Sequence, residues 1–229
     1  MTPFSPLLTP RSIAALSVEQ TEFLNAVLSH YRQAWFPMNN PETGGTEWVR
    51  ARRRGIIPIE PEKFHVGGTL RARVRSARFR ISTDTAFKEV IRSCATPAAG
   101  RPDTWIDPTI IETFDLLHTA GLAHSVEAWI DEPGVPSRLV GGLYGLALGR
   151  IFCGESMFSN PADGGTDASK VCLVKLVSHL RARQFQVLDA QLANAHLEQF
   201  GLYTVDRRTY TRWLDQWADD AADWLPWTA

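Results

Sequence analysis

The segment VLDAQLAN at residues 187–194 carries a carboxyl group and two amides where a short apolar strand ends. Asp189 and Gln191 stand two residues apart, so on a strand their side chains point to the same face. A carboxylate behind an amide, with Asn194 next along the chain, could form a hydrogen-bonded relay that orients and polarises a reacting group. The alternative from the residues alone is a strand end followed by a capping asparagine.

The segment IFCGESMFS at residues 151–159 places a glutamate inside an otherwise apolar strand. Alternation puts Cys153, Glu155 and Met157 on one face of that strand. An unpaired carboxylate is costly to bury, so an edge strand with Glu155 in solvent is the simpler alternative. The aromatic and glycine residues on either side favour a buried Glu155 that faces a charged ligand.

Glycines and a helix start nearby suggest further contacts with a ligand. Gly141, Gly142 and Gly145 lie inside a predicted strand, where glycine marks either a bulge or the close approach of a ligand. We favour a ligand groove. At residues 168–170, ASK opens a helix and offers backbone N–H groups, a hydroxyl and a cation to a phosphate. The alternative is a simple cap with a solvated Lys170.

Residues 50–80 form a basic segment in a chain whose net charge is −1. The segment holds nine arginines and one lysine against two glutamates, which leaves about eight positive charges without acidic partners nearby in the sequence. Five arginines gather near its end: Arg71, Arg73, Arg75, Arg78 and Arg80. Arginine contacts with phosphates give affinity that falls steeply with salt and reads little sequence. We expect RNA binding through shape and phosphates, with a solvated face as the alternative.

The elements that must position these groups alternate between helices and strands. Apolar residues at helical spacing and capping residues predict the helices. Alternating apolar and polar residues in segments bounded by turn residues predict the strands. The predicted helices cover residues 18–33, 69–75, 84–94, 108–120, 168–182, 195–200 and 207–220. Strand and loop are predicted at 48–61, and strands at 78–82, 125–130, 139–148, 151–159 and 187–191. This order predicts the α+β class, with a sheet layered against helices.

The bulk composition excludes several classes of protein. With 229 residues, 44% hydrophobic and 21% charged, the chain is globular and long enough for a sizeable core. No apolar run approaches the about 18 residues that a membrane helix needs, and the N-terminal segment does not resemble a signal peptide. Three cysteines without CxxC spacing and histidines without an HExxH pattern predict reduced thiols, no metal and a cytoplasmic location.

The order of these segments resembles the leucyl/phenylalanyl-tRNA–protein transferases, which move an amino acid from its tRNA onto the N-terminus of a protein. The resemblance runs from about Tyr31 to Trp217 and is densest from Thr104 to Gly201. It implies an acetyltransferase-like (GNAT-like) mixed sheet with flanking helices, and a small N-terminal α/β domain. We expect a reduced N-terminal domain at residues 1–75 and the catalytic domain at 76–229.

The resemblance also implies roles for individual residues. Gln191 would hold the reacting α-amine or the ester, Asp189 would orient and polarise it, and Glu155 would face an ammonium group. The substrate would contact Met38, Trp105, Leu143, Phe152, Ser156, Leu176, Leu188 and Asn194, five of which form a slot for an apolar side chain. The five arginines near the end of the basic segment, with Ser169 and Lys170, would contact the tRNA.

The chain departs from the family pattern at several places. Phe36-Pro37-Met38 stands where relatives have FPW, Ala34 replaces a usual glycine, and a GLLAxGGDL-type segment is absent before residue 31. A short insertion-like stretch at residues 161–167 precedes ASK. These differences leave open the preference among Leu, Phe and Met, and they predict a different grip on the tRNA.

The sequence therefore predicts an aminoacyltransferase that conjugates Leu or Phe, with Met as a further donor, to proteins beginning with Arg or Lys, marking them for N-degron proteolysis. Aminoacyl-tRNA esters are already activated, so no cofactor, ATP or metal is expected. Two alternatives remain: transfer to a small-molecule acceptor, and an RNA-binding relative without catalysis. An acetyl-CoA enzyme is disfavoured because the chain has no Q/R-x-x-G-x-G/A loop.

Overall fold

A computed structural model describes residues 7–40, 42–97, 104–220 and 222–227. Its centre is a seven-stranded sheet in the order β4-β5-β6-β7-β8-β3-β9. The strands are β3 Arg53–Ile57, β4 Arg80–Thr83, β5 Ala123–Glu132, β6 Val135–Leu148, β7 Ile151–Ser159, β8 Val187–Gln191 and β9 Tyr203–Asp206. Neighbouring strands are antiparallel except β7 and β8, which are parallel. This mixed sheet with its helices confirms the predicted α+β class.

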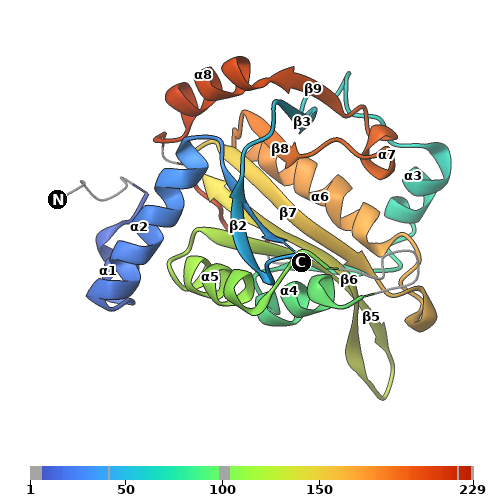
Figure 1. Cartoon of the computed structure of the whole chain (residues 1–229). Coiled ribbons are helices and arrows are strands. Elements are labelled where there is room, and N and C mark those ends of the chain that lie inside the picture. Colours follow the sequence, from blue (N-terminus) through green and yellow to red (C-terminus); the bar gives the residue numbers. More distant parts are fainter. Residues whose placement is uncertain (1–6, 41, 98–103, 221, 228–229) are drawn as a thin grey trace.

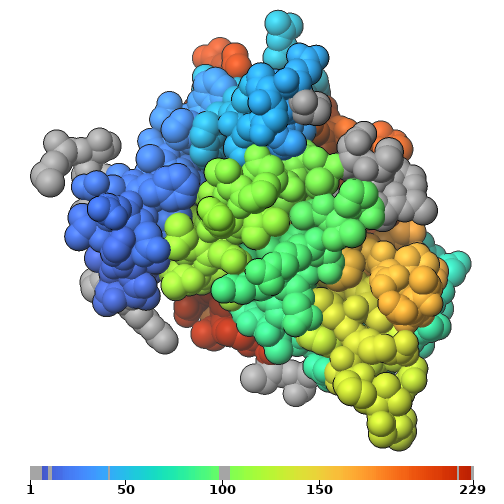
Figure 2. Space-filling view, turned by 60° about the horizontal axis from the view of Figure 1, so that its bottom comes forward, coloured from blue at the N-terminus to red at the C-terminus, as the bar shows by residue number. Residues whose placement is uncertain are grey.

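Helices cover both faces of the sheet, with α6 on one side and α4 and α5 on the other (Figure 1). The helices are α1 Pro10–Ala14, α2 Val18–Arg32, α3 Gly68–Arg75, α4 Phe87–Ala95, α5 Pro108–Thr119, α6 Ala168–Ala182, α7 Ala195–Glu198 and α8 Arg207–Trp217. Figure 2 shows α4 and α5 side by side on the surface, with the tip of the β5–β6 hairpin projecting beyond them. Two clusters of buried apolar side chains, one on each face, form the core.

Local capping signals set several helix starts as the sequence predicts. Ser17 caps α2 in a reciprocal capping box with Gln20. Asp107 caps α5 by accepting a hydrogen bond from the Ile110 N–H, and Pro108 occupies the first helical position. The sequence favours Thr83 or Asp84 as the cap of α4, and this prediction is wrong, because Ala86 occupies the N-cap position without a side-chain cap. The Asp84 carboxylate instead accepts hydrogen bonds from the Ser125 N–H and the Trp224 indole.

Three features of the sheet were not predicted. A separate hairpin pairs β1 (Phe36–Asn40) with β2 (Gly45–Val49), and strand β9 follows α7. Strand β3 inserts between β8 and β9. Since β3 lies within residues 1–75, the expected N-terminal domain contributes a strand to the main sheet. The two-domain division and the GNAT-like relationship remain predictions.

The strand glycines make room for the protein itself, so the prediction of a ligand groove at these positions is wrong. A Cβ at Gly141 would lie 2.4 Å from the Ala168 Cβ, on helix α6. A Cβ at Gly145 would lie 2.4 Å from the Cys153 carbonyl oxygen, at a register shift between β6 and β7. The bulge, which was the alternative interpretation, is what the structure contains at Gly145.

Candidate active site

The candidate site lies where strands β7 and β8 separate. The two strands pair only from Ile151 with Val187 to Cys153 with Asp189, and beyond this point no pairing joins them. A cavity of about 340 Å³ is lined by residues of both strands just past the last pair. Asp189 on β8 and Glu155 on β7 both line it, so the segments 187–194 and 151–159 meet at this cavity.

Asp189 forms a buried ion pair with Arg54 of β3, and neither side chain is more than 2% exposed. The Arg54 Nε lies 2.9 Å from Asp189 Oδ1, and Arg54 Nη2 lies 2.7 Å from Oδ2. The Tyr210 hydroxyl of α8 also donates to Oδ2, at 2.7 Å. Burial alone would lower the pKa of Arg54, but the charge of Asp189 outweighs it and raises that pKa above its ordinary value.

Gln191 departs from strand geometry at the end of β8. Its φ of 58° lies in the left-handed region that non-glycine residues seldom adopt. Its backbone N–H donates to Asp189 Oδ1 at 2.8 Å, which holds the turn against the ion pair. Backbone strain of this kind persists only where surrounding contacts enforce it, and it is common at functional sites.

Glu155 is buried beside Tyr31 of α2, whose hydroxyl donates to Glu155 Oε1 at 2.9 Å. Burial raises the pKa of Glu155 to about 7, although the Gln191 amide and the Tyr31 hydroxyl act to lower it. The amide is near, yet Gln191 Nε2 and Glu155 Oε2 form no hydrogen bond with any part of the chain that the structure describes. Buried polar atoms are nearly always paired. Glu155 lines the cavity, whereas Gln191 lies beside it without lining it, so a small shift of the Gln191 amide would pair the two atoms with each other or with a ligand.

Apolar side chains form the remainder of the cavity. Six of the eight predicted substrate contacts line it: Trp105, Leu143, Ser156, Leu176, Leu188 and Asn194. Further lining residues that the sequence analysis did not select include Ile57, Tyr144, Met157, Leu173, His196 and Leu197. The lining is therefore rich in leucine, and its two carboxylates come from within strands β7 and β8.

Two predicted substrate contacts, Phe152 and Met38, are absent from the lining of this cavity. Phe152 pairs with Leu188 where β7 and β8 are still joined, and its ring stacks on Trp224 at 5.4 Å between centroids. Met38 belongs to the separate hairpin, where it pairs with Glu47. Phe152 belongs to the buried apolar core, and Met38 is partly buried against the cluster on the other face of the sheet.

The basic segment is only partly free to bind a polyanion. Arg80 forms an ion pair with Asp131 at 2.6 Å, and Arg73 lies 3.3 Å from Asp167. Acids distant in the sequence thus balance two of the five arginines, which the sequence analysis did not anticipate. The remaining three are exposed and have no ion pair within the described ranges: Arg71, Arg75 and Arg78.

The start of α6 differs from a simple phosphate-binding helix end. Ser169 is buried, and its backbone N–H donates to the Ser159 hydroxyl at 2.9 Å. Lys170 is half-buried and its ammonium lies 3.0 Å from Asp167 Oδ1. Both residues are therefore already bound within the chain, and Lys170 would have to leave or share Asp167 to contact a phosphate. No helix in the described part of the chain is long and apolar enough to cross a membrane.

A mixed α+β sheet, with two buried carboxylates on neighbouring strands beside a largely apolar cavity, defines a candidate group-transfer enzyme. Residues 58–215 match the family described as leucyl/phenylalanyl-tRNA protein transferase. The chain belongs to this family and is an aminoacyltransferase, which confirms the resemblance noted in the sequence.

Relatives carrying the name leucyl/phenylalanyl-tRNA–protein transferase are similar over most of their length. The protein from Paramagnetospirillum magneticum is 46% identical over 198 residues, covering 86% of this chain and 88% of the relative. The one from Synechococcus sp. is 42% identical over 193 residues, covering 84% and 93%. The one from Herpetosiphon aurantiacus is 45% identical over 184 residues, covering 80% and 88%.

Proposed function

We propose that this enzyme transfers Leu or Phe, with Met as a further donor, from aminoacyl-tRNA to the N-terminal Arg or Lys of acceptor proteins. The acceptors would then enter N-degron proteolysis in the cytoplasm. The observation that supports the proposal most directly is the cavity of about 340 Å³, whose lining joins many apolar side chains with Glu155 and Asp189. An apolar side chain would fill the cavity while the reacting groups lie beside these carboxylates.

The walls of the cavity favour an apolar donor side chain. Leu143, Leu176 and Leu188 offer no group that could pair a buried charge. Burying an unpaired charge is strongly unfavourable, so charged amino acids would be rejected. Met157 also lines the cavity, and its flexible side chain can adapt to donors of different shape.

Glu155 supports the orientation of an amine. With a pKa of about 7, its carboxyl is partly ionised at neutral pH, and Oε2 has no partner within the described structure. An α-ammonium group bound there would satisfy this oxygen. Gln191 Nε2, a donor without an acceptor, would meet the ester or carbonyl oxygen of the donor.

The proposed reaction is aminolysis of the aminoacyl ester. The acceptor nitrogen attacks the ester carbonyl carbon, the new C–N bond forms, and the C–O bond to the ribose of the 3′ adenosine breaks. The acceptor amine loses a proton and the ribose oxygen gains one. Holding both substrates in register supplies much of the rate, and donors aimed at the developing oxyanion supply more.

The exposed arginines support a tRNA contact away from the cavity. Arg71, Arg75 and Arg78 present positive charge that no described acid neutralises. Contacts of this kind would bind the phosphates and shape of the acceptor stem and leave the choice of donor to the cavity.

The proposal is tested by measuring transfer of radiolabelled leucine from Leu-tRNA to a peptide that begins with Arg. A peptide identical except for an N-terminal Ala is the control, and Phe-tRNA and Met-tRNA are the other donors. We expect label on the Arg peptide alone. Absence of label from every donor would overturn the protein acceptor and favour a small-molecule acceptor.

A further inference from the structure

Arg54 is the largest side chain in the fully buried part of the described structure, and it is only 2% exposed. Its guanidinium carbon lies over the rings of Phe36 and Tyr210, 4.7 Å from each ring centroid. Nη1 donates to the Ala34 carbonyl oxygen at 3.3 Å, and the other two nitrogens bind Asp189. Arg54 thus connects its own strand, β3, to three other parts of the chain, at residues 34–36, 189 and 210.

Stability alone does not account for such an arrangement. Removing two charges from water is so costly that a buried ion pair gives little stability beyond apolar side chains of similar volume. Two parallel hydrogen bonds to the Asp189 carboxylate and the aromatic rings beside the guanidinium offset this desolvation cost. The same contacts fix the plane of the guanidinium group. The geometric consequence is a rigid connection next to the cavity.

The ion pair is linked to two of the residues that, in the described part of the chain, hold a buried polar atom without a hydrogen-bond partner in or beside the cavity, Gln191 and Glu155. On one side, Asp189 Oδ1 accepts from the Gln191 N–H and holds that residue in its left-handed turn. On the other, Arg54 binds the Ala34 carbonyl, three residues after Tyr31, whose hydroxyl binds Glu155. Ala34 itself has a φ of 66°, so this short turn is also held away from common backbone geometry.

We propose that Arg54 is a positioning residue for aminoacyl transfer, which sets the separation of Gln191 from Glu155 across the opening between β7 and β8. The positioning role of Arg54 rests on the proposed aminoacyl transfer only in its kinetic test. Arg54 also neutralises Asp189, so of the two carboxylates that line the cavity only Glu155 can offer its charge to an ammonium group.

Arg54→Lys is the decisive variant, because lysine keeps the charge but loses the fixed fork and the planar stacking. We expect kcat for transfer to fall about 100-fold, the loss associated with a small misplacement of reacting groups. The KM for aminoacyl-tRNA should stay unchanged. Tyr210→Phe, which keeps the ring over Arg54 but removes one hydrogen bond to Asp189, should lower kcat in the same direction by a smaller factor.

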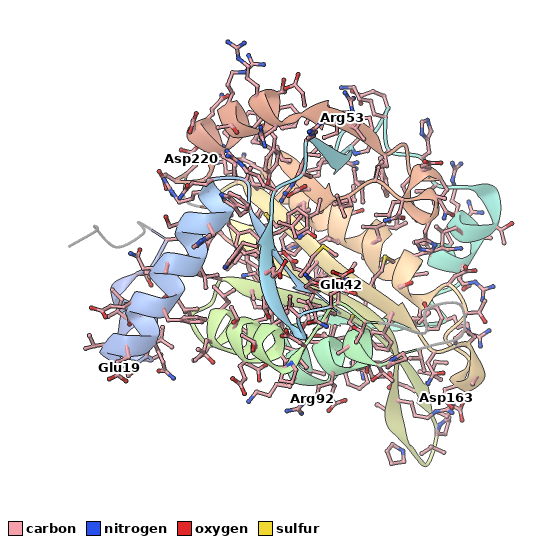
Figure 3. The ribbon with its side chains drawn as sticks, in the orientation of Figure 1. Glu19, Glu42, Arg53, Arg92, Asp163 and Asp220 are labelled. Carbon is pink, nitrogen blue, oxygen red and sulfur yellow. The ribbon has the colours of Figure 1, made fainter. Side chains whose placement is uncertain are left out.

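Arg53→Lys is the matched control. Arg53 is the exposed neighbour on β3, labelled in Figure 3, and it bonds to Thr204 rather than to the ion pair. We expect wild-type kinetics from this variant. Thermal unfolding and tRNA binding of all variants would show whether each is folded.

A second readout does not require transfer activity. Titration of the Glu155 carboxyl by carbon-13 NMR should show a higher pKa in Arg54→Lys, because Tyr31 would no longer be held against the carboxylate. Wild-type kcat in Arg54→Lys, or a rise in KM alone, would overturn the proposal. If the wild-type protein transferred no amino acid, the proposed function would fail, and an unchanged Glu155 titration would then overturn the positioning role by itself.

Discussion

Replacing Glu155 by glutamine should change how the stability of the protein depends on pH. In the unfolded chain this carboxyl loses its proton near its ordinary pKa of 4.5, whereas burial raises its pKa in the folded protein to about 7. Between these values the unfolded state is ionised while the folded state keeps the proton. The stability that the protonated Glu155 contributes is therefore complete below pH 4.5 and is lost as the pH rises through 7.

The size of the effect follows from the difference between the two pKa values. A rise from 4.5 to about 7 corresponds to about 3 kcal/mol of unfolding free energy. The amide that replaces the carboxyl cannot ionise, and its carbonyl oxygen can still accept the Tyr31 hydrogen bond, so the variant avoids the loss. Relative to wild type, Glu155→Gln should gain about 3 kcal/mol between pH 4.5 and about pH 8.

Urea unfolding of both proteins at about pH 5, 6, 7 and 8 measures this difference directly. In thermal scans the gain corresponds to about 6–12 °C in the melting temperature for a chain of this length. The exposed Glu112→Gln is the control for general loss of a negative charge. If the free-energy difference between Glu155→Gln and wild type were the same at both ends of this pH range, the buried and pKa-shifted state of Glu155 would be refuted.

Three further changes test other parts of the structure. Gln191→Ala should lower transfer sharply in steady-state assays while the unfolding midpoint stays close to wild type; equal activity would remove Gln191 from the site. Arg75→Ala should make log Kd for tRNA less dependent on log salt by about one unit, and the paired Arg80→Ala by less; equal slopes would contradict the distinction. Gly145→Ala should cost about 2 kcal/mol in urea unfolding, because the new methyl group would meet the Cys153 carbonyl oxygen; wild-type stability would contradict that contact.

The sequence predicts the elements around the site well because their signals are local. The periodic apolar pattern and the strand ends place α6 at residues 168–182, β7 at 151–159 and β8 at 187–191, and the structure has the same bounds. The sequence also places Glu155 and Asp189 within apolar strands, but it does not predict that these two strands are neighbours. The parallel pairing of β7 with β8 is the one further fact that brings these two carboxylates to one cavity.

The partners of these carboxylates could not be predicted in the same way. Tyr31 lies 124 residues before Glu155, and Arg54 lies 135 residues before Asp189. Arg54 reaches Asp189 because β3 pairs with β8, and Tyr31 reaches Glu155 from α2, which packs against α5 and α8. Neither the hydrophobic pattern nor the capping signals of a single segment contain this information.

The burial of Asp189 nevertheless limits what its partner can be. A carboxylate within an apolar strand must be matched by a cation or several donors, so a buried arginine or lysine could have been expected from VLDAQ. The chain offers 24 such residues, and charge density directs attention to the exposed end of the basic segment. Arg54 differs from its neighbours Arg52 and Arg53 because only Gly55 separates it from the buried apolar residues 56 and 57 of β3. A basic run that leads into a buried strand should therefore be examined residue by residue, since one of its members can be the cation that the core requires.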